Sequence, residues 1–254
     1  FQTSAQSEQA SGLVEMSAPG RHESFADRTL WPTVLALAVL IGVFEFTEID
    51  LRLQDQFYDF ATRQWLVDRD HPVGRALFYH GPKVALGILA LSLLALTAGP
   101  ADWRTRWRVA RPDLGVALLT LATLPVLAGL GKQFTNVYCP SEILRYGGNA
   151  PYVALCEPYP VDFQPVTKGH CFPAGHASGG FALMALAWLR PSRRWRIGGL
   201  ALGLGAGWWM GGYQMLKGAH YLSHTVVTMV LAWIVILAWR RVLRPPKLAT
   251  GDSR

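Results

Sequence analysis

The feature that most constrains this chain is a succession of six apolar blocks, separated by short basic or Pro/Gly-rich stretches. A helix that crosses the hydrocarbon core of a bilayer needs roughly 20 mostly apolar residues, and a shorter one is tolerated where its neighbours shield it. Only 16% of the residues are charged, whereas an average soluble domain has roughly 25%. We therefore predict an all-α, polytopic membrane protein with six transmembrane helices. The six blocks are Leu30–Phe46, Val84–Ala98, Leu114–Leu130, Ser178–Leu189, Ile197–Leu216 and Thr225–Leu243.

Lysine and arginine gather in alternate connections between these blocks, which predicts the orientation of the helices. Cytoplasmic connections of membrane proteins carry an excess of positive charge. The connections 99–113 and 190–196 and the C-terminal tail are basic, so we place them, with both termini, in the cytoplasm. The connections 47–83, 131–177 and 217–224 then face outward, and we expect short interfacial helices in them. The basic residues are Arg104, Arg106, Arg108, Arg111, Arg190, Arg193, Arg194, Arg196, Arg240, Arg241, Arg244 and Lys247.

The six helices are expected to form one membrane domain. No soluble segment is longer than about 50 residues. We therefore predict a single domain over residues 30–247, with a flexible arm at 1–29 and a flexible tail at 248–254. The formal net charge is +7, but the excess lies beside the apolar blocks, where it orients helices in a bilayer. We expect a lipid bilayer, and no nucleic acid, as a partner.

Four glycines, Gly199, Gly203, Gly207 and Gly211, recur at every fourth position of the fifth block. They share one face of the predicted helix, where small residues let a neighbouring helix approach closely. We interpret this face as a packing surface.

Polar residues gather in the last two outward connections and at the adjoining helix ends. Ionisable side chains at membrane depth are energetically unfavourable, so a group of them indicates a functional site. Lys132 is the most informative member, because it follows directly on an apolar block. The group comprises Lys132, Arg145, Lys168, His170, His176, Gln214, Lys217, His220 and His224.

Three segments of this region resemble the signatures of one known family. KQFTNVYCP begins at Lys132, PAGH ends at His176, and QMLKGAHYLSH ends at His224. In order and internal spacing they resemble K-x6-R-P, P-S-G-H and S-R-x5-H-x3-D of the type 2 phosphatidic acid phosphatase family. The resemblance is close over about residues 130–225, and the six-helix layout extends it loosely to the rest of the chain.

The resemblance implies a role for each matched residue. His220 would be the nucleophile, His176 the general acid and Lys132 a phosphate ligand, with no metal or other cofactor. The chemistry is physically sound without the resemblance, because a phosphate dianion is bound by cations and by the amides of a helix N-terminus, here at Gly175. A histidine that attacks phosphorus divides one difficult displacement into two easier ones. The further phosphate-binding candidates are Gly175, Gln214, Lys217, Lys168 and Arg145.

Among the matched positions that depart from the family pattern, four bear directly on the chemistry. Cys139 and Gln214 replace two arginines, Ala174 replaces a serine, and His224 replaces the aspartate that would orient the nucleophile. Lys217 lies one helical turn from Gln214 and is expected to restore one charge, while a neutral His224 can accept a hydrogen bond and so serve catalysis. The departures are similar to a divergent bacterial branch with Q-x-x-[RK]-G-A-H-x-x-S-H and C-F-P-A-G-H.

The outward connection 131–177 contains Cys139, Cys156 and Cys171, and oxidation is allowed on the outer face. Three cysteines permit one disulfide, whose pairing the sequence leaves open. We favour Cys139–Cys171, because each borders a segment that the resemblance brings to one site.

The sequence therefore predicts an integral membrane lipid phosphatase of the bacterial cytoplasmic (inner) membrane, with its active site facing the periplasm and a phosphohistidine intermediate. Its partner would be a phosphorylated membrane lipid: lipid A, undecaprenyl pyrophosphate, phosphatidylglycerol phosphate or phosphatidic acid. Two alternatives are a lipid-to-lipid phosphotransferase and a non-catalytic lipid-phosphate binder or transporter. A metal or haem site built from His176, His220 and His224 is a third. The oligomeric state stays open.

Overall fold

The computed structural model describes residues 25–164 and 167–244. The chain is mostly helical (71%), as the apolar blocks predict. The arm is described only from Phe25, where the first helix begins, five residues before Leu30. Most of the predicted arm, Lys247 and the tail at 248–254 lie outside the described residues.

Among the described residues, four helical segments are long and apolar enough to cross a membrane. They are α1 (Phe25–Glu45), the continuous segment Pro72–Ala98, the segment Arg111–Glu142 that contains α6 (Arg111–Thr135), and α9 (Leu222–Leu243). The segment Pro72–Ala98 is made of α3 (Pro72–Arg75), the π-helix η2 (Ala76–His80) and α4 (Gly81–Ala98). It begins twelve residues before Val84, where the apolar block begins.

The other two predicted spans are helical, but length and hydropathy alone do not identify them as spans. The fourth is divided into α7 (Gly175–Ala182) and the 3-10 helix η5 (Leu183–Trp188). The fifth is α8 (Arg193–Leu216), which is glycine-rich and begins with arginines. The α7 helix packs against α6, α8 and α9, and Phe181 in its last turn is fully buried. Because its neighbours surround it, this short helix does not need a long apolar surface of its own.

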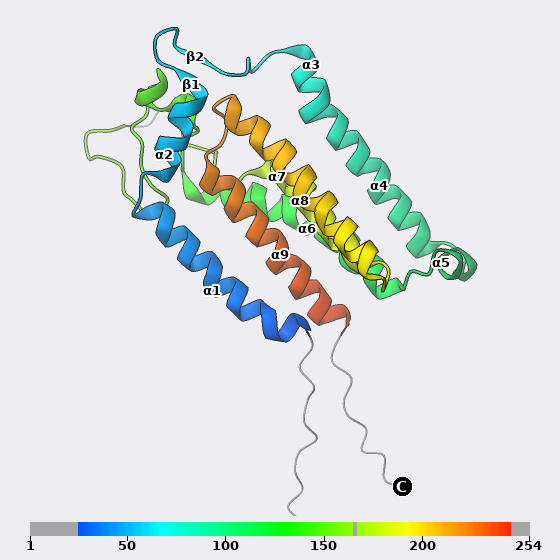
Figure 1. The fold of residues 1–254 in the computed structure, drawn as a ribbon. Coiled ribbons are helices and arrows are strands. Elements are labelled where there is room, and N and C mark those ends of the chain that lie inside the picture. The colour runs from blue at the N-terminus through cyan, green and yellow to red at the C-terminus, as the bar shows by residue number, and fades with distance from the viewer. Residues whose placement is uncertain (1–24, 165–166, 245–254) are drawn as a thin grey trace, which may run out of the picture.

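The long helices run side by side, and most of the short elements gather at one end of the bundle (Figure 1). The start of α1 and the end of α9 lie at the other end, as do the start of α8 and the short helix α5 (Ala101–Trp107). The short elements at the first end include α2 (Ile49–Gln54), within the connection where we expect an interfacial helix. The others are η1 (Asp55–Phe57), β1 (Tyr58–Asp59), antiparallel β2 (Gln64–Trp65), η3 (Pro140–Glu142) and η4 (Leu144–Tyr146).

The glycine face of α8 packs directly on the neighbouring backbone, which confirms the predicted close approach. A Cβ atom added at Gly203 would lie 2.3 Å from the amide nitrogen of Met184, and one at Gly199 would lie 2.5 Å from that of Ala187. A Cβ at Gly207 would lie 2.1 Å from the ring of Phe181. Because backbone atoms cannot move aside as a flexible side chain can, Gly199 and Gly203 require glycine.

We expect Gly203→Ala to destabilise the fold by about 1–3 kcal/mol, because the added methyl group overpacks the contact with Met184. The matched control is Gly205→Ala, two residues along the same helix, where an added Cβ meets no atom of the described residues within 4 Å. That change should leave the free energy of unfolding unchanged or raise it by up to about 1 kcal/mol, since alanine favours helix. Thermal unfolding in detergent compares them, and equal melting temperatures would contradict the packing role.

Candidate active site

The turn between α8 and α9 places the third matched segment at one end of the bundle. Gly218 has φ +70°, the left-handed conformation that commonly ends a helix. The amide of Gly218 donates to the carbonyl of Met215 at 3.0 Å, and that of Ala219 donates to Gln214 at 2.8 Å. A Cβ at Gly218 would also collide with the ring of Trp65, 2.3 Å away. The turn therefore requires glycine, and it holds Lys217 and His220 between the two helices.

Hydrogen bonds attach the PAGH segment to α9, and Cys171, just before PAGH, to the chain that follows α6. The amide of Ala174 donates to Thr228 Oγ1 at 2.9 Å and to the carbonyl of His224 at 3.3 Å. The amide of Cys171 donates to the carbonyl of Val137 at 2.9 Å. The favoured disulfide, between Cys139 and Cys171, is present, and Cys156 is a free, exposed cysteine. The three matched segments thus meet at one place.

Three histidines come together where these segments meet. The ring centroids of His176 and His220 lie 6.0 Å apart, and Nδ1 of His220 lies 3.3 Å from Nδ1 of His224. His220 and His224 are each 2% exposed. The Nδ1 atom of His176 is buried and has no hydrogen-bond partner among the described residues. One ring of the His220–His224 pair must donate and the other accept, so the pair fixes the tautomer of both.

Burial lowers the pKa of His220 well below its ordinary value, and the nearby His224, Lys132 and His176 lower it further. Desolvation disfavours the charged form of an imidazole. His220 is therefore neutral at pH 7, and a neutral imidazole has the lone pair that a nucleophile needs.

Three lysines from different helix ends surround the histidines. Lys132, in the last turn of α6, approaches the start of α7 so closely that a Cβ at Gly175 would lie 3.7 Å from its Nζ. Lys217 lies directly after α8, with Nζ 5.0 Å from the ring centre of Tyr213. Burial, together with Arg69 and Arg75, lowers the pKa of Lys217. The positive charges of Lys132, Lys83 and Lys217 all act on His176.

Lys83 and Tyr79 belong to the site although the sequence did not single them out. The ring of Tyr79 lies 5.0 Å from that of His176, and Lys83 Nζ lies 3.8 Å above the ring of Tyr79. Lys83 is in the first turn of α4. The available signal was its position directly before an apolar block, the mirror image of Lys132 directly after one. Lys83 supplies a cation in a site that has lost two signature arginines.

The start of α7 and the side chain of Gln214 contribute hydrogen-bond donors. No side chain of the described residues caps α7, so the first amides of the helix, from Gly175 onward, are available to an anion. Gln214 is 1% exposed, and its Nε2 atom has no partner within the described part of the chain. A buried, unpaired N–H group is unfavourable until an acceptor arrives.

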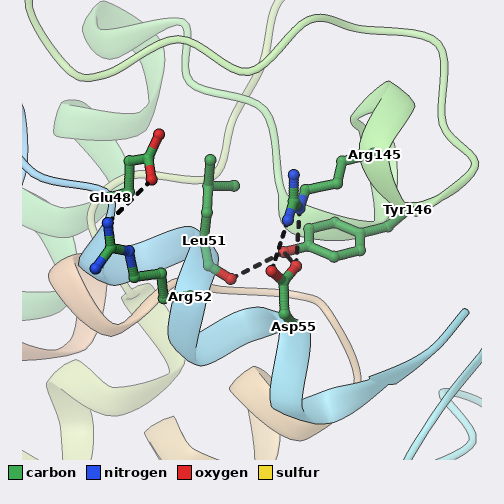
Figure 2. Close-up of polar contacts among 6 residues, drawn as sticks. All are labelled: Glu48, Leu51, Arg52, Asp55, Arg145 and Tyr146. Atoms are coloured by element: carbon green, nitrogen blue, oxygen red, sulfur yellow. Dashed lines mark hydrogen bonds and ion pairs between the residues drawn. The ribbon is translucent and has the colours of Figure 1, made fainter.

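Arg145 and Lys168 have other surroundings than those we expected. Arg145 donates to both carboxylate oxygens of Asp55, at 2.8 and 2.6 Å, and Tyr146 donates to the same carboxylate at 2.9 Å (Figure 2). The hydrogen bonds from Arg145 lower the pKa of Asp55. Arg145 thus ties η4 to η1, and Lys168 is exposed in the loop before α7. We assign neither residue to phosphate binding.

Two buried residues of α2 hold the turn that carries His220, and sequence reasoning missed both. Asp50 accepts a hydrogen bond from the amide of Ser223, in the first turn of α9, at 2.8 Å. Gln54 donates to the carbonyl of Met215, in the last turn of α8, at 2.8 Å. They are 4% and 1% exposed. No local pattern distinguishes them from other polar residues of their connection, because both partners are more than 150 residues away in the chain.

Cys171, His220 and His224 present ligand atoms within 4.8 Å of one another, and they are the one such group of three in the described part of the chain. Zinc sites require deprotonated thiolates, imidazoles or carboxylates. The sulfur of Cys171 is already bonded to Cys139, which leaves two imidazoles. The group does not include His176, so it differs from the three-histidine metal site considered above.

Comparison with known proteins identifies the family. A family model described as the PAP2 superfamily matches residues 113–246, more than half of the chain. The chain belongs to the PAP2 superfamily. The matched segment contains all three histidines, Lys132 and Lys217, and membership indicates phosphatase activity. No curated protein and no solved structure matches the chain.

Asp50 gives a test of the α2 contact through the pH dependence of stability. Burial raises the pKa of Asp50 to about 6, above the roughly 3.9 of an unfolded chain. The folded state therefore binds the proton more tightly, and the contribution of Asp50 to stability falls as the pH rises from about 4 to 6. Asp50→Asn removes this dependence while keeping an acceptor for the amide of Ser223. The stability of wild type relative to the variant should fall by on the order of 3 kcal/mol over this range.

Thermal unfolding of both proteins at several pH values between about 4 and 7 measures this difference. The exposed acid Asp162 provides the control, because Asp162→Asn removes the same charge from the protein surface and not from a buried contact. A wild-type minus Asp50→Asn difference that stays constant from pH 4 to 7 would mean that Asp50 is not a buried, desolvated acid.

Proposed function

We propose that the chain is an integral membrane lipid phosphatase that removes a phosphate from a lipid headgroup through a phosphohistidine intermediate. The observation that carries the proposal is the approach of His176 and His220, 6.0 Å between ring centroids, at the uncapped start of α7. Two imidazoles at one anion-binding helix end can attack phosphorus and protonate a leaving group.

The phosphate would be bound by cations and by preorganised donors. Lys132, Lys83 and Lys217 offset its charge, and the first amides of α7 and the unpaired Nε2 of Gln214 donate to its oxygens. Phosphoryl transfer depends mainly on positioning and on stabilising charge in a site that excludes water. The buried, unpaired atoms of His176 and Gln214 support a ligand at this position.

The reaction would proceed in two balanced steps. His220 donates Nδ1–H to Nδ1 of His224, which leaves the lone pair on Nε2 of His220 free to attack phosphorus. The N–P bond forms as the P–O bond to the lipid breaks, and the leaving oxygen takes a proton from His176, which enters the step as the imidazolium because the bound phosphate dianion offsets the lysine charges. Water then attacks the phosphohistidine, His176 takes a proton from the water, and inorganic phosphate leaves as the N–P bond breaks. In this scheme His224 does the orienting work of the aspartate in the family signature.

The bilayer context supports a lipid as the substrate. We propose the six-helix topology over residues 30–247, with α7–η5 and α8 as the fourth and fifth spans and the histidines facing the periplasm of a bacterial inner membrane. The basic connections at the opposite end support this orientation. Lipid A, undecaprenyl pyrophosphate, phosphatidylglycerol phosphate and phosphatidic acid are the candidate substrates.

His220→Asn should reduce phosphate release by at least about a thousandfold, because the nucleophile is lost. The assay is inorganic phosphate release from a panel of the four lipid phosphates, with purified protein in detergent. The matched control is His71→Asn, an exposed residue that caps the short helix α3, a role that asparagine also fills.

The wild-type result separates the alternative activities. Transfer of the phosphate from the donor lipid to an added lipid acceptor, with no inorganic phosphate released in the absence of acceptor, would identify a phosphotransferase. No turnover of any lipid phosphate by folded wild-type protein would identify a binder or transporter. Turnover that survives His220→Asn would exclude His220 as the nucleophile.

Lys83→Gln and Lys217→Gln should each lower kcat/KM by about 10- to 100-fold, because each removes a charge that stabilises the transition state. The control is Arg106→Gln, which removes one positive charge from the exposed surface of α5 at the far end of the bundle. Steady-state kinetics on the best lipid substrate provide the comparison. If the three variants lose the same activity, the lysines act only through net charge and not by binding phosphate.

A further inference from the structure

A charged cavity of about 410 Å³ lies at the end of the bundle opposite to the histidines. It is formed where α6 and α8 begin and α9 ends, with the residue that follows α5 at its rim. Nothing in the proposed phosphatase reaction uses this place. The charged residues that line it are Arg108, Arg190, Arg196, Arg240, Arg244 and Asp113.

The cavity has more positive than negative charge among its described residues. Asp113 binds Arg244 through both carboxylate oxygens and lies 4.0 Å from a guanidinium nitrogen of Arg240. Five positive charges against one negative charge leave a surplus of four. Like charges repel at close range, so this surplus favours an anion in the cavity.

Arg240 is the residue that points most clearly to a ligand. Its Nε atom is buried and has no hydrogen-bond partner among the described residues. Its guanidinium lies 4.8 Å from the ring centre of Trp188, and that of Arg196 lies 6.0 Å from the same ring. Stacking on an aromatic ring orients a guanidinium without occupying its N–H groups. The fork of an arginine matches the oxygens of a phosphate.

The surroundings of the cavity favour a lipid headgroup over a soluble anion. Part of its wall is apolar, formed by Trp188 and Leu189. On the adjoining helix α5, the side chains of Trp103 and Trp107 are 49% and 59% exposed. Exposed tryptophans are typical of the level at which lipid headgroups lie, and basic pockets between transmembrane helices bind anionic headgroups.

We propose that this cavity binds the phosphate of an anionic phospholipid in the leaflet opposite to the catalytic histidines. The apolar wall contacts the glycerol and the start of the acyl chains, while Arg196 and Arg240 bind the phosphate oxygens. The proposal does not depend on the phosphatase reaction.

Native mass spectrometry of the full chain in detergent, titrated with phosphatidylglycerol or phosphatidylcholine, tests the proposal. Wild-type protein should retain phosphatidylglycerol in preference to phosphatidylcholine. Arg196→Gln should weaken the retention of phosphatidylglycerol by about tenfold, since one charge-assisted hydrogen bond is lost. The matched control is Arg194→Gln, which removes the same charge from the exposed first turn of α8, two residues away and outside the cavity.

Each outcome decides the question. Equal weakening by Arg194→Gln and Arg196→Gln would mean diffuse attraction to a basic surface and would overturn the site. Displacement of phosphatidylglycerol by excess inorganic phosphate would assign the cavity to a soluble anion instead. Arg240→Gln should weaken the retention of phosphatidylglycerol more than Arg196→Gln does. If the Arg240→Gln variant does not fold, the Arg196→Gln variant still tests the site, because Arg196 is exposed. The wild type and the arginine variants have the same histidine site. Any lipid bound there contributes equally to each of them and does not affect the comparison of their phosphatidylglycerol retention.

Discussion

The site depends on one backbone amide, that of Ala174. It donates to the side chain of Thr228 and to the carbonyl of His224, and so it fixes the start of α7 against the start of α9. His176 is two residues beyond this amide, and His220 is four residues before His224. An unpaired amide in a membrane protein would be strongly unfavourable, so these bonds also select the position at which the two helices meet. The rest of the site is arranged around this junction.

The positive charge of the site comes from lysines of three different helical segments. Lys132 lies in the last turn of α6, Lys83 lies in the first turn of α4 within the continuous segment Pro72–Ala98, and Lys217 directly follows α8. Long side chains at such positions can keep their stems in an apolar environment while the ammonium groups lie in a polar one. In the proposed reaction, these lysines compensate for the two signature arginines that the chain lacks, because they approach the proposed phosphate position from other helices. The basic cavity at the opposite end is lined by arginines, whose side chains can bind a phosphate through two N–H groups.

Much of the fold was predictable because it depends on local pattern. The apolar blocks correspond to helices, and Gly199, Gly203 and Gly207 meet the backbone or ring that their spacing predicts. The helix boundaries were less well predicted. The helix that contains Val84 begins at Pro72, and α1 begins at Phe25. The predicted blocks begin later than these helices, because hydropathy marks the apolar part of a helix and not its polar first turns. Tertiary contacts, which hydropathy does not report, extend these helices beyond the blocks.

The sequence by itself determined the local parts of the candidate site: three histidines and Lys132 at family spacings, a glycine that ends α8, and a helix that starts at the PAGH segment. Each of these depends on residues within about one or two helical turns of each other, where geometry follows from the helix repeat. Only the tertiary structure decided that Lys83 and Tyr79 join the site, that Asp50 and Gln54 hold the α8–α9 turn, and that Arg145 is engaged by Asp55. Those partners are about 90 or more residues apart, and a long chain separation leaves their distance undetermined until all the helices have packed.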